Sequence, residues 1–240
     1  MKKNCPAAAG ALSFSHHPPK HAVLRLMLIL VMILAGSVQA DECDQLPPPS
    51  VTVTRIDENF TISDQFGYKE LTHLGAALAQ PGREVLGLTR GKAVVQVTTN
   101  SPLYIDRTGR WECASPQIKV SFGFSPTVVY VAKEFPAGSC AYREIFQHEL
   151  RHVQAYQAHA AMIEKEVSDT LNRRFATGGP WRGPVGQTRT RLQRELNERW
   201  IPYIQREMKR GDEAQARIDT PEEYARVANS CNGEINRRTR

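Results

Sequence analysis

Residues 147–153 decide the fold, and they read Gln147-His148-Glu149-Leu150-Arg151-His152-Val153. His148 and His152 are four residues apart, so on a helix both imidazoles share one face and can reach one metal ion. Glu149 would then stand beside the open position of the metal, where a carboxylate that is not a ligand can take a proton from a metal-activated water. The stretch therefore predicts a site for one Zn²⁺ per chain, with His148 and His152 as ligands and Glu149 as the general base.

The surrounding sequence predicts that this motif lies on one long helix. Ser139 can cap a helix, and no Gly or Pro occurs between Ser139 and Thr177. Apolar residues at three- and four-residue steps mark a buried stripe, namely Ile145, Tyr156, Ala160, Ile163, Val167 and Leu171. Glu149 and His152 fall on this stripe and His148 lies beside it. Polar groups there are costly unless they are hydrogen-bonded or bound to a metal.

The motif resembles that of the zincin metallopeptidases, in which the two residues between the glutamate and the second histidine are usually uncharged. Leu150 fits that pattern and Arg151 does not. The alternative interpretation is a helix with two hydrogen-bonded histidines and a paired glutamate, and no catalytic metal.

A catalytic zinc normally has three protein ligands, and the motif supplies two. His159 shares the helical face, but on a continuous helix it would lie roughly 10 Å beyond His152 along the axis. An acidic residue from a later helix could be the third ligand, and the candidates are Glu195, Glu198, Glu207 and Asp219. The sequence does not choose among them. Glu223 is better explained as the capping-box residue of a helix that starts at Thr220-Pro221.

The first 40 residues have the pattern of an export signal. Four basic residues and no acidic residue precede or flank an apolar run at 26–35, and Val38-Gln39-Ala40 fits the small-x-small cleavage rule. The run is short for a membrane span, so we expect no stable span after cleavage. We therefore expect residues 1–40 to be a signal peptide and residues 41–240 to be a single exported domain, periplasmic or secreted. An uncleaved anchor and a later start methionine stay open.

Cysteine and charge agree with export of a protein that does not bind nucleic acid. Cys43, Cys113, Cys140 and Cys231 follow the signal, an even number that suits disulfides in an oxidising compartment. Of the three possible pairings we favour Cys113–Cys140 with Cys43–Cys231; a thiolate metal site is disfavoured because no Cys-x-x-Cys occurs. Residues 41–240 contain 27 basic and 25 acidic residues. This near balance gives no reason to expect nucleic acid or an anionic membrane as partner.

The remaining patterns predict an α+β fold in which a small sheet packs on the motif helix and helices follow. Alternating or β-rich runs predict strands at 51–56, 93–99, 118–124 and 128–131, with a turn at Gly123–Pro126 between the last two. The helical C-terminal part, about 187–240, should contain a helix over 190–210 that Pro202 kinks or divides and that ends at Gly211. A last helix should start at Thr220.

The stretch from about Val51 to Leu171 resembles an uncharacterised bacterial group, the predicted secreted zinc-dependent proteases. The shared features are the export signal, a β-rich half with Trp111 and Cys113, a second Cys before the motif, and the motif on a long helix. The resemblance implies a zincin-like exported metallopeptidase that hydrolyses peptide bonds, with His148 and His152 as zinc ligands and Glu149 as the catalytic residue. The alternative is a disulfide-stabilised exported binding or structural protein with no catalytic metal. The cleaved peptide or protein, the oxyanion-stabilising residue and the oligomeric state stay open.

Overall fold

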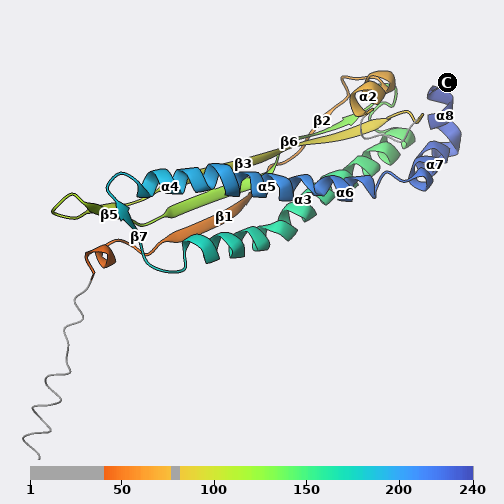
Figure 1. Ribbon diagram of the computed structural model, residues 1–240. Coiled ribbons are helices and arrows are strands. Elements are labelled where there is room, and N and C mark those ends of the chain that lie inside the picture. Colours follow the sequence, from red (N-terminus) through yellow and green to blue (C-terminus); the bar gives the residue numbers. More distant parts are fainter. Residues whose placement is uncertain (1–40, 77–81, 240) are drawn as a thin grey trace, which may run out of the picture. The chain divides into compact units, whose positions relative to one another are not determined.

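A computed structural model describes residues 41–76 and 82–239, so the expected signal peptide at 1–40 lies outside the described residues. The elements in chain order are η1 (Glu42–Gln45), β1 (Ser50–Ile56), β2 (Thr61–Ser63), α2 (Tyr68–Gly75), β3 (Gly87–Asn100), β4 (Leu103–Ile105), β5 (Trp111–Ala114), β6 (Gln117–Val131), α3 (Cys140–Phe175), β7 (Trp181–Pro184), α4 (Thr188–Glu195), η2 (Leu196–Trp200), α5 (Ile201–Lys209), α6 (Gly211–Ala216), α7 (Pro221–Asn229), η3 (Cys231–Gly233) and α8 (Glu234–Arg238) (Figure 1).

The main sheet is built on β6. On one side β1 runs parallel to the first half of β6 and β2 runs parallel to its second half, and on the other side β3 is antiparallel to most of its length. Within the part of the chain that the structure describes, β3 pairs with no further strand and is therefore an edge of the sheet.

The turn that we expected at Gly123–Pro126 is wrong, because β6 is one continuous strand that passes through a cis Ser125–Pro126 bond. Gly91 of β3 pairs with Thr127 and Ala93 pairs with Phe124, so Ser125 and Pro126 stand opposite the single residue Lys92 and form a β-bulge in β6. Pro126 has no N–H to donate, and the bulge leaves that position without a ladder partner. The strand continues because β3 pairs with it on both sides of the bulge.

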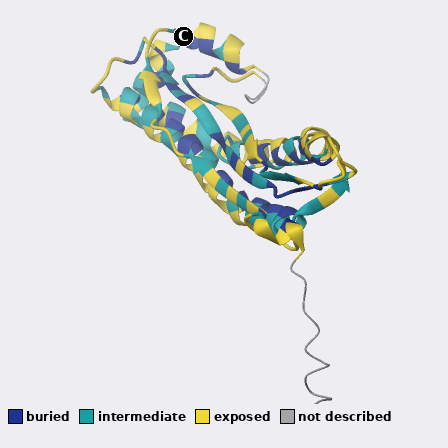
Figure 2. Ribbon diagram, turned by 90° about the vertical axis from the view of Figure 1, so that its left-hand side faces the viewer, coloured by how far each residue is buried: buried dark blue, intermediate teal, exposed yellow. Residues whose placement is uncertain are grey.

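One face of the main sheet is covered by helices. The first core cluster joins apolar residues of β6, the C-terminal half of α3 and the α4–η2–α5 segment: Ile118, Val120, Phe122, Ala160, Ile163, Val167, Leu171, Phe175, Leu192, Leu196, Trp200, Ile204 and Met208. On the opposite face Thr52, Lys119 and Thr98 are paired neighbours on three strands and are exposed. The alternation of apolar and polar residues thus produces a sheet with one buried and one solvated face. In Figure 2 the outer side of the helices is likewise exposed.

The second core cluster lies around the start of α3. It joins α2, the beginning of β3, the end of β6 and the C-terminal helices through Tyr68, Leu71, Val85, Leu88, Val131, Ala132, Phe135, Ala141, Ile145, Val227 and Ile235. Helix α3 therefore belongs to both clusters, since Ile145 packs in one and Ala160 in the other. Glu149 and His152 lie between them.

The disulfides are Cys43–Cys113 and Cys140–Cys231, with Cα atoms 5.8 and 5.7 Å apart, so the pairing that we favoured is wrong. Cys113 lies on β5, in a second, three-stranded sheet of order β4–β5–β7, and Cys140 begins α3. Between β5 and α3 the chain passes along β6, whose 15 residues span roughly 50 Å. Cys113 is therefore carried away from Cys140, which lies instead beside the C-terminal helices.

The C-terminal helices differ from expectation in two places. A π-helical turn, η2, ends at Trp200, two residues before Pro202, and joins α4 to α5. Gly211 begins α6 and does not end a helix; a Cβ there would lie 3.0 Å from the His159 ring, so the glycine allows α6 to approach α3. The start of α7 after Thr220 is confirmed, because the Thr220 hydroxyl accepts a hydrogen bond from the N–H of Glu223 at 3.2 Å.

The fold is thus a mixed α/β arrangement with a long motif helix, as expected. None of the described helices combines the length and the apolar character that a membrane span requires. The two disulfides are compatible with an exported protein, because disulfides persist in oxidising compartments.

Candidate metal centre

The motif lies on α3, about two turns after the helix begins. Ser139 caps the helix by accepting a hydrogen bond from the N–H of Tyr142 at 3.1 Å. Glu149 and His152 are buried and His148 is half-buried, so the motif faces inward as its place on the apolar stripe predicts.

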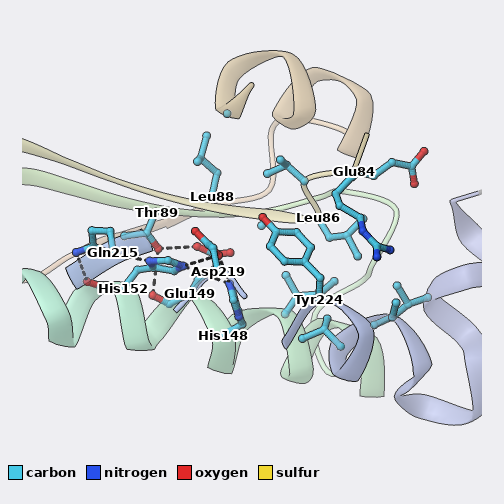
Figure 3. Close-up of a pocket in the computed structure, with 18 of the residues that line it drawn as sticks. Glu84, Leu86, Leu88, Thr89, His148, Glu149, His152, Gln215, Asp219 and Tyr224 are labelled. Atoms are coloured by element: carbon cyan, nitrogen blue, oxygen red, sulfur yellow. Dashed lines mark hydrogen bonds and ion pairs between the residues drawn. The ribbon is translucent and has the colours of Figure 1, made fainter. Parts of the chain in front are cut away.

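Asp219, in the loop before α7, brings a third ligand atom to the two histidines (Figure 3). Asp219 Oδ1 lies 3.1 Å from His148 Nε2 and 3.3 Å from His152 Nε2, and the two Nε2 atoms are 3.2 Å apart. Ligands about 2.0–2.1 Å from a tetrahedral zinc ion lie roughly 3.3–3.4 Å from one another. The three atoms therefore have nearly the spacing of one face of a zinc tetrahedron.

The other candidates for a third ligand are engaged elsewhere. Glu195 pairs with Arg174, Glu207 pairs with Arg210, and Glu198 is exposed on η2. His159 Nε2 lies 2.7 Å from the backbone oxygen of Glu207, so His159 is away from the centre, as its position on the helix predicts. Asp219 is the candidate that the fold brings to the motif.

Gln215 on α6 fixes the orientation of His152. Gln215 Nε2 donates to the backbone oxygen of His152 at 3.2 Å, so the Gln215 amide oxygen faces the ring, where it lies 2.6 Å from Nδ1. An amide oxygen can only accept, so Nδ1 of His152 carries the proton. In the neutral ring, Nε2 then has its lone pair directed toward His148 and Asp219.

Glu223 on α7 holds His148 in a comparable way, and this differs from the capping-box role that we expected for it. The Glu223 carboxylate turns to α3, where Oε1 lies 3.2 Å from His148 Nδ1 and also accepts from Arg151 Nη2. Arg226 donates to both Glu223 oxygens, at 2.8 and 2.9 Å. These hydrogen bonds from Arg226, opposed by burial and strengthened by Arg151, hold the pKa of Glu223 well below its usual value.

The charged residue that departs from the zincin pattern thus has a structural role. Arg151 Nη2 bonds to Glu223 and lies 3.0 Å from His148 Nδ1. Nδ1 of His148 thus faces an acceptor, Glu223 Oε1 at 3.2 Å, and a donor, Arg151 Nη2 at 3.0 Å. In the tautomer with the proton on Nδ1, Glu223 accepts that proton and Nε2 faces the centre with its lone pair. A carboxylate or carbonyl partner on the outer nitrogen is the usual support for a metal-binding histidine.

Asp219 is ionised at neutral pH in this arrangement. Burial alone raises the pKa of Asp219, but the hydrogen bonds and charges of His148 and His152 outweigh burial and lower the pKa to about 2. When Nδ1 carries the proton on both rings, two nitrogen lone pairs and a carboxylate oxygen converge within 3.3 Å. Three such acceptors repel one another unless a metal ion or a proton on one Nε2 lies between them.

Glu149 lies beside this cluster and close to the edge strand. Its Oε2 accepts a hydrogen bond from Thr89 Oγ1 at 2.8 Å, and a Cβ at Gly87 would lie 2.6 Å from its Oε1. Only glycine at position 87 allows β3 to pass this close to the carboxylate. Burial raises the pKa of Glu149, although His152, His148 and Thr89 oppose the change.

Comparisons of this chain with protein families, with curated proteins and with solved structures find no match. The sequence had singled out His148, Glu149 and His152, and it had included Asp219 among four acidic candidates. It missed Gln215, Thr89 and Gly87, which carry no motif. Their roles depend on the packing of β3 and α6 against α3, for which local sequence gives no signal.

Proposed function

We propose that the chain is an exported zinc-dependent peptidase with His148, His152 and Asp219 as metal ligands and Glu149 as the general base. The observation that carries the proposal is the convergence of three acceptor atoms within 3.1–3.3 Å on a helix that also presents a buried carboxylate. Two imidazoles and one carboxylate are a common donor set for catalytic zinc, which keeps a fourth position open.

The donor atoms and their support fit zinc better than a hard cation. Two of the three atoms are imidazole nitrogens, whereas magnesium and calcium prefer oxygen ligands. Gln215 and Glu223 each place an acceptor oxygen against the outer nitrogen of a ring, which favours the tautomer whose inner nitrogen can bind a metal. This support favours a zincin-like centre over two histidines that are merely buried.

Zinc, when bound, would supply a Lewis acid that polarises a carbonyl group and makes a water molecule more acidic. Glu149 would accept the proton from the attacking water and later return it to the leaving amine. Thr89 orients the Glu149 carboxylate through its hydroxyl, and burial excludes bulk water from that carboxylate. The β3 edge passes Glu149 at Gly87–Thr89 and could pair with an extended peptide through main-chain hydrogen bonds.

Metal content tests the proposal directly. The protein is purified without chelator and analysed by elemental analysis, as wild type, as the double variant His148→Ala/His152→Ala, and as Asp219→Ala. We expect about one zinc per chain in the wild type, none in the double variant, and weakened binding in Asp219→Ala. His73→Ala, which removes an exposed histidine on α2, is the matched control and should keep the zinc.

A folded, oxidised wild type that takes up no zinc even after addition would refute the metal centre. The acceptor cluster would then be held together by a proton, since hydrogen bonds to Asp219 and Gln215 and the charges of Glu149 and Asp219 outweigh burial and raise the pKa of His152. The chain would in that case be a disulfide-stabilised binding or structural protein.

A further inference from the structure

The metal centre opens into one cavity that has two chemically different halves. The cavity measures about 380 Å³ and runs between the segment that leads into β3 and the C-terminal helices. Its polar half contains the motif side chains with Thr89, Gln215 and Asp219. The rest of the described lining is mainly apolar, although it also includes the polar residues Arg83, Glu84, Asn236 and Thr239. The cavity as a whole is larger than a few water molecules would require.

The apolar half is built by residues from four segments of the chain. Its lining comprises Leu86 before β3, Ile145 on α3, Tyr224, Val227 and Ala228 on α7, and Ile235 on α8. Ile145, Val227 and Ile235 are buried members of the second core cluster. The wall is therefore the face of a packed core, which gives it a fixed shape.

This apolar wall begins next to the metal ligands. Ile145 precedes His148 by three residues on α3, about 4.5 Å along the helix axis. The Tyr224 ring lies 6.4 Å from the His148 ring, measured between centroids. Figure 3 shows Tyr224 between His148 and Leu86, at the boundary between the two halves. A peptide whose scissile carbonyl is held at the metal would thus place the side chain of the flanking residue against this apolar wall.

We propose that the apolar half is a specificity subsite that takes a bulky apolar side chain of the residue flanking the scissile bond. The inference rests on the proposed function, because it needs the metal to fix the scissile group. Burial of a leucine-sized side chain against such a wall should strengthen binding about tenfold to a hundredfold.

An acidic side chain fits this cavity poorly. The described lining contains four carboxylates, Glu84, Glu149, Asp212 and Asp219, and one cationic side chain of the Arg or Lys type, the exposed Arg83. A carboxylate placed against the apolar wall would lose its hydration without gaining a partner there. The subsite should therefore discriminate by charge as well as by size.

Zinc-binding hydroxamates test the subsite without relying on turnover. Dissociation constants are measured by titration calorimetry on the zinc-loaded full-length chain for three probes: acetohydroxamate, a hydroxamate with an isobutyl side chain, and one with a carboxymethyl side chain. We expect the isobutyl probe to bind at least tenfold more tightly than acetohydroxamate, and the carboxymethyl probe to bind no more tightly than acetohydroxamate.

A larger side chain in the apolar wall should abolish the tighter binding of the isobutyl probe and leave the binding of acetohydroxamate unchanged. Ala228→Phe, with Ala228→Leu as a smaller change in case the first variant does not fold, should bind acetohydroxamate like the wild type but lose the advantage of the isobutyl probe. Ala225→Phe is the control, because Ala225 is exposed on the same helix and does not line the cavity. It should behave like the wild type with all three probes.

The outcomes separate the two proposals. Equal affinity for the isobutyl and carboxymethyl probes, or an isobutyl advantage that survives in the folded Ala228 variants, would overturn the subsite and leave the zinc centre intact. Failure of the wild type to bind zinc would instead overturn the proposed function, and the subsite with it.

Discussion

Two buried glutamates, one on β5 and one on α3, have opposite hydrogen-bonding environments. Glu112 on β5 is 1% exposed, and Glu149 on α3 is 3% exposed. Glu112 accepts hydrogen bonds from Gly186 N at 2.7 Å, Thr188 N at 2.8 Å and Thr188 Oγ1 at 2.5 Å. At Glu149 the described donor is the Thr89 hydroxyl.

The difference in hydrogen bonding gives the two carboxyl groups opposite pKa shifts. Burial raises the pKa of both, but at Glu112 the hydrogen bonds from Thr188 and Gly186 outweigh burial and the pKa is lowered. At Glu149 burial prevails and the pKa is raised. A carboxylate with several donors stabilises the structure that holds it, whereas a buried carboxylate with few donors costs stability and is suited to proton transfer.

The comparison predicts its largest effect for Glu149→Gln. Removal of a general base should lower kcat/KM by about a hundredfold to ten-thousandfold, because the amide cannot accept the proton. Zinc content should stay at the wild-type level and thermal stability should not fall, since the variant replaces a poorly solvated charge by a neutral group of the same shape. The assay uses quenched fluorescent peptides with an apolar residue beside the scissile bond. Unchanged turnover in this variant would remove Glu149 from the mechanism.

Glu112→Ala should have the opposite effect, a loss of stability with zinc content retained. It leaves the buried donors of Gly186 and Thr188 without an acceptor, so we expect a loss of about 2–4 kcal/mol in the free energy of unfolding. Denaturant titration measures this loss, and elemental analysis of the folded fraction should still find the wild-type zinc content. A variant that loses zinc before it loses stability would show that the Glu112 site and the proposed metal centre are coupled.

The same contrast explains how much could be predicted from the sequence. The apolar stripe from Ile145 to Leu171 predicted α3 and its buried face, because helix periodicity is a local property. His148, Glu149 and His152 were found because they share one helix and one motif. Asp219 could not be chosen over Glu195, Glu198 or Glu207, since only the packing of α6 and α7 on α3 decides which carboxylate reaches the motif. Glu112 gave no signal at all, because its donors come from the chain more than 70 residues later. The disulfide pairing failed for the same reason.

Glu223 sharpens the comparison, because it is a carboxylate with several hydrogen-bond donors that lies at the proposed metal centre. Glu223→Gln weakens its bonds to Arg226 and Arg151 and removes the charged acceptor facing His148 Nδ1. Loss of such a supporting carboxylate should lower zinc affinity by about tenfold to a hundredfold. Competition with a chromophoric chelator measures the affinity, and Glu222→Gln, an exposed neighbour on α7, is the matched control. Equal affinities in the two variants would mean that Glu223 serves only to join α7 to α3.

The smallest expected effect concerns the pH dependence of stability. A carboxyl group whose pKa in the folded state is lowered contributes stability above its unfolded pKa, near 4.5 for Glu112, and this contribution disappears as the pH falls through the folded value. The wild type should therefore lose stability below about pH 4.5, and Glu112→Gln should lose less over the same interval because it has no proton to take up there. Glu149→Gln should lose at least as much stability as the wild type, since the raised pKa of Glu149 means that its protonation favours the folded state as the pH falls. Urea titrations between pH 3 and pH 7 compare the three proteins. If the free energy of unfolding falls equally with pH in the wild type and in Glu112→Gln, the hydrogen bonds at Glu112 do not favour its charged form. The proposed difference between the two buried glutamates would then be wrong for Glu112.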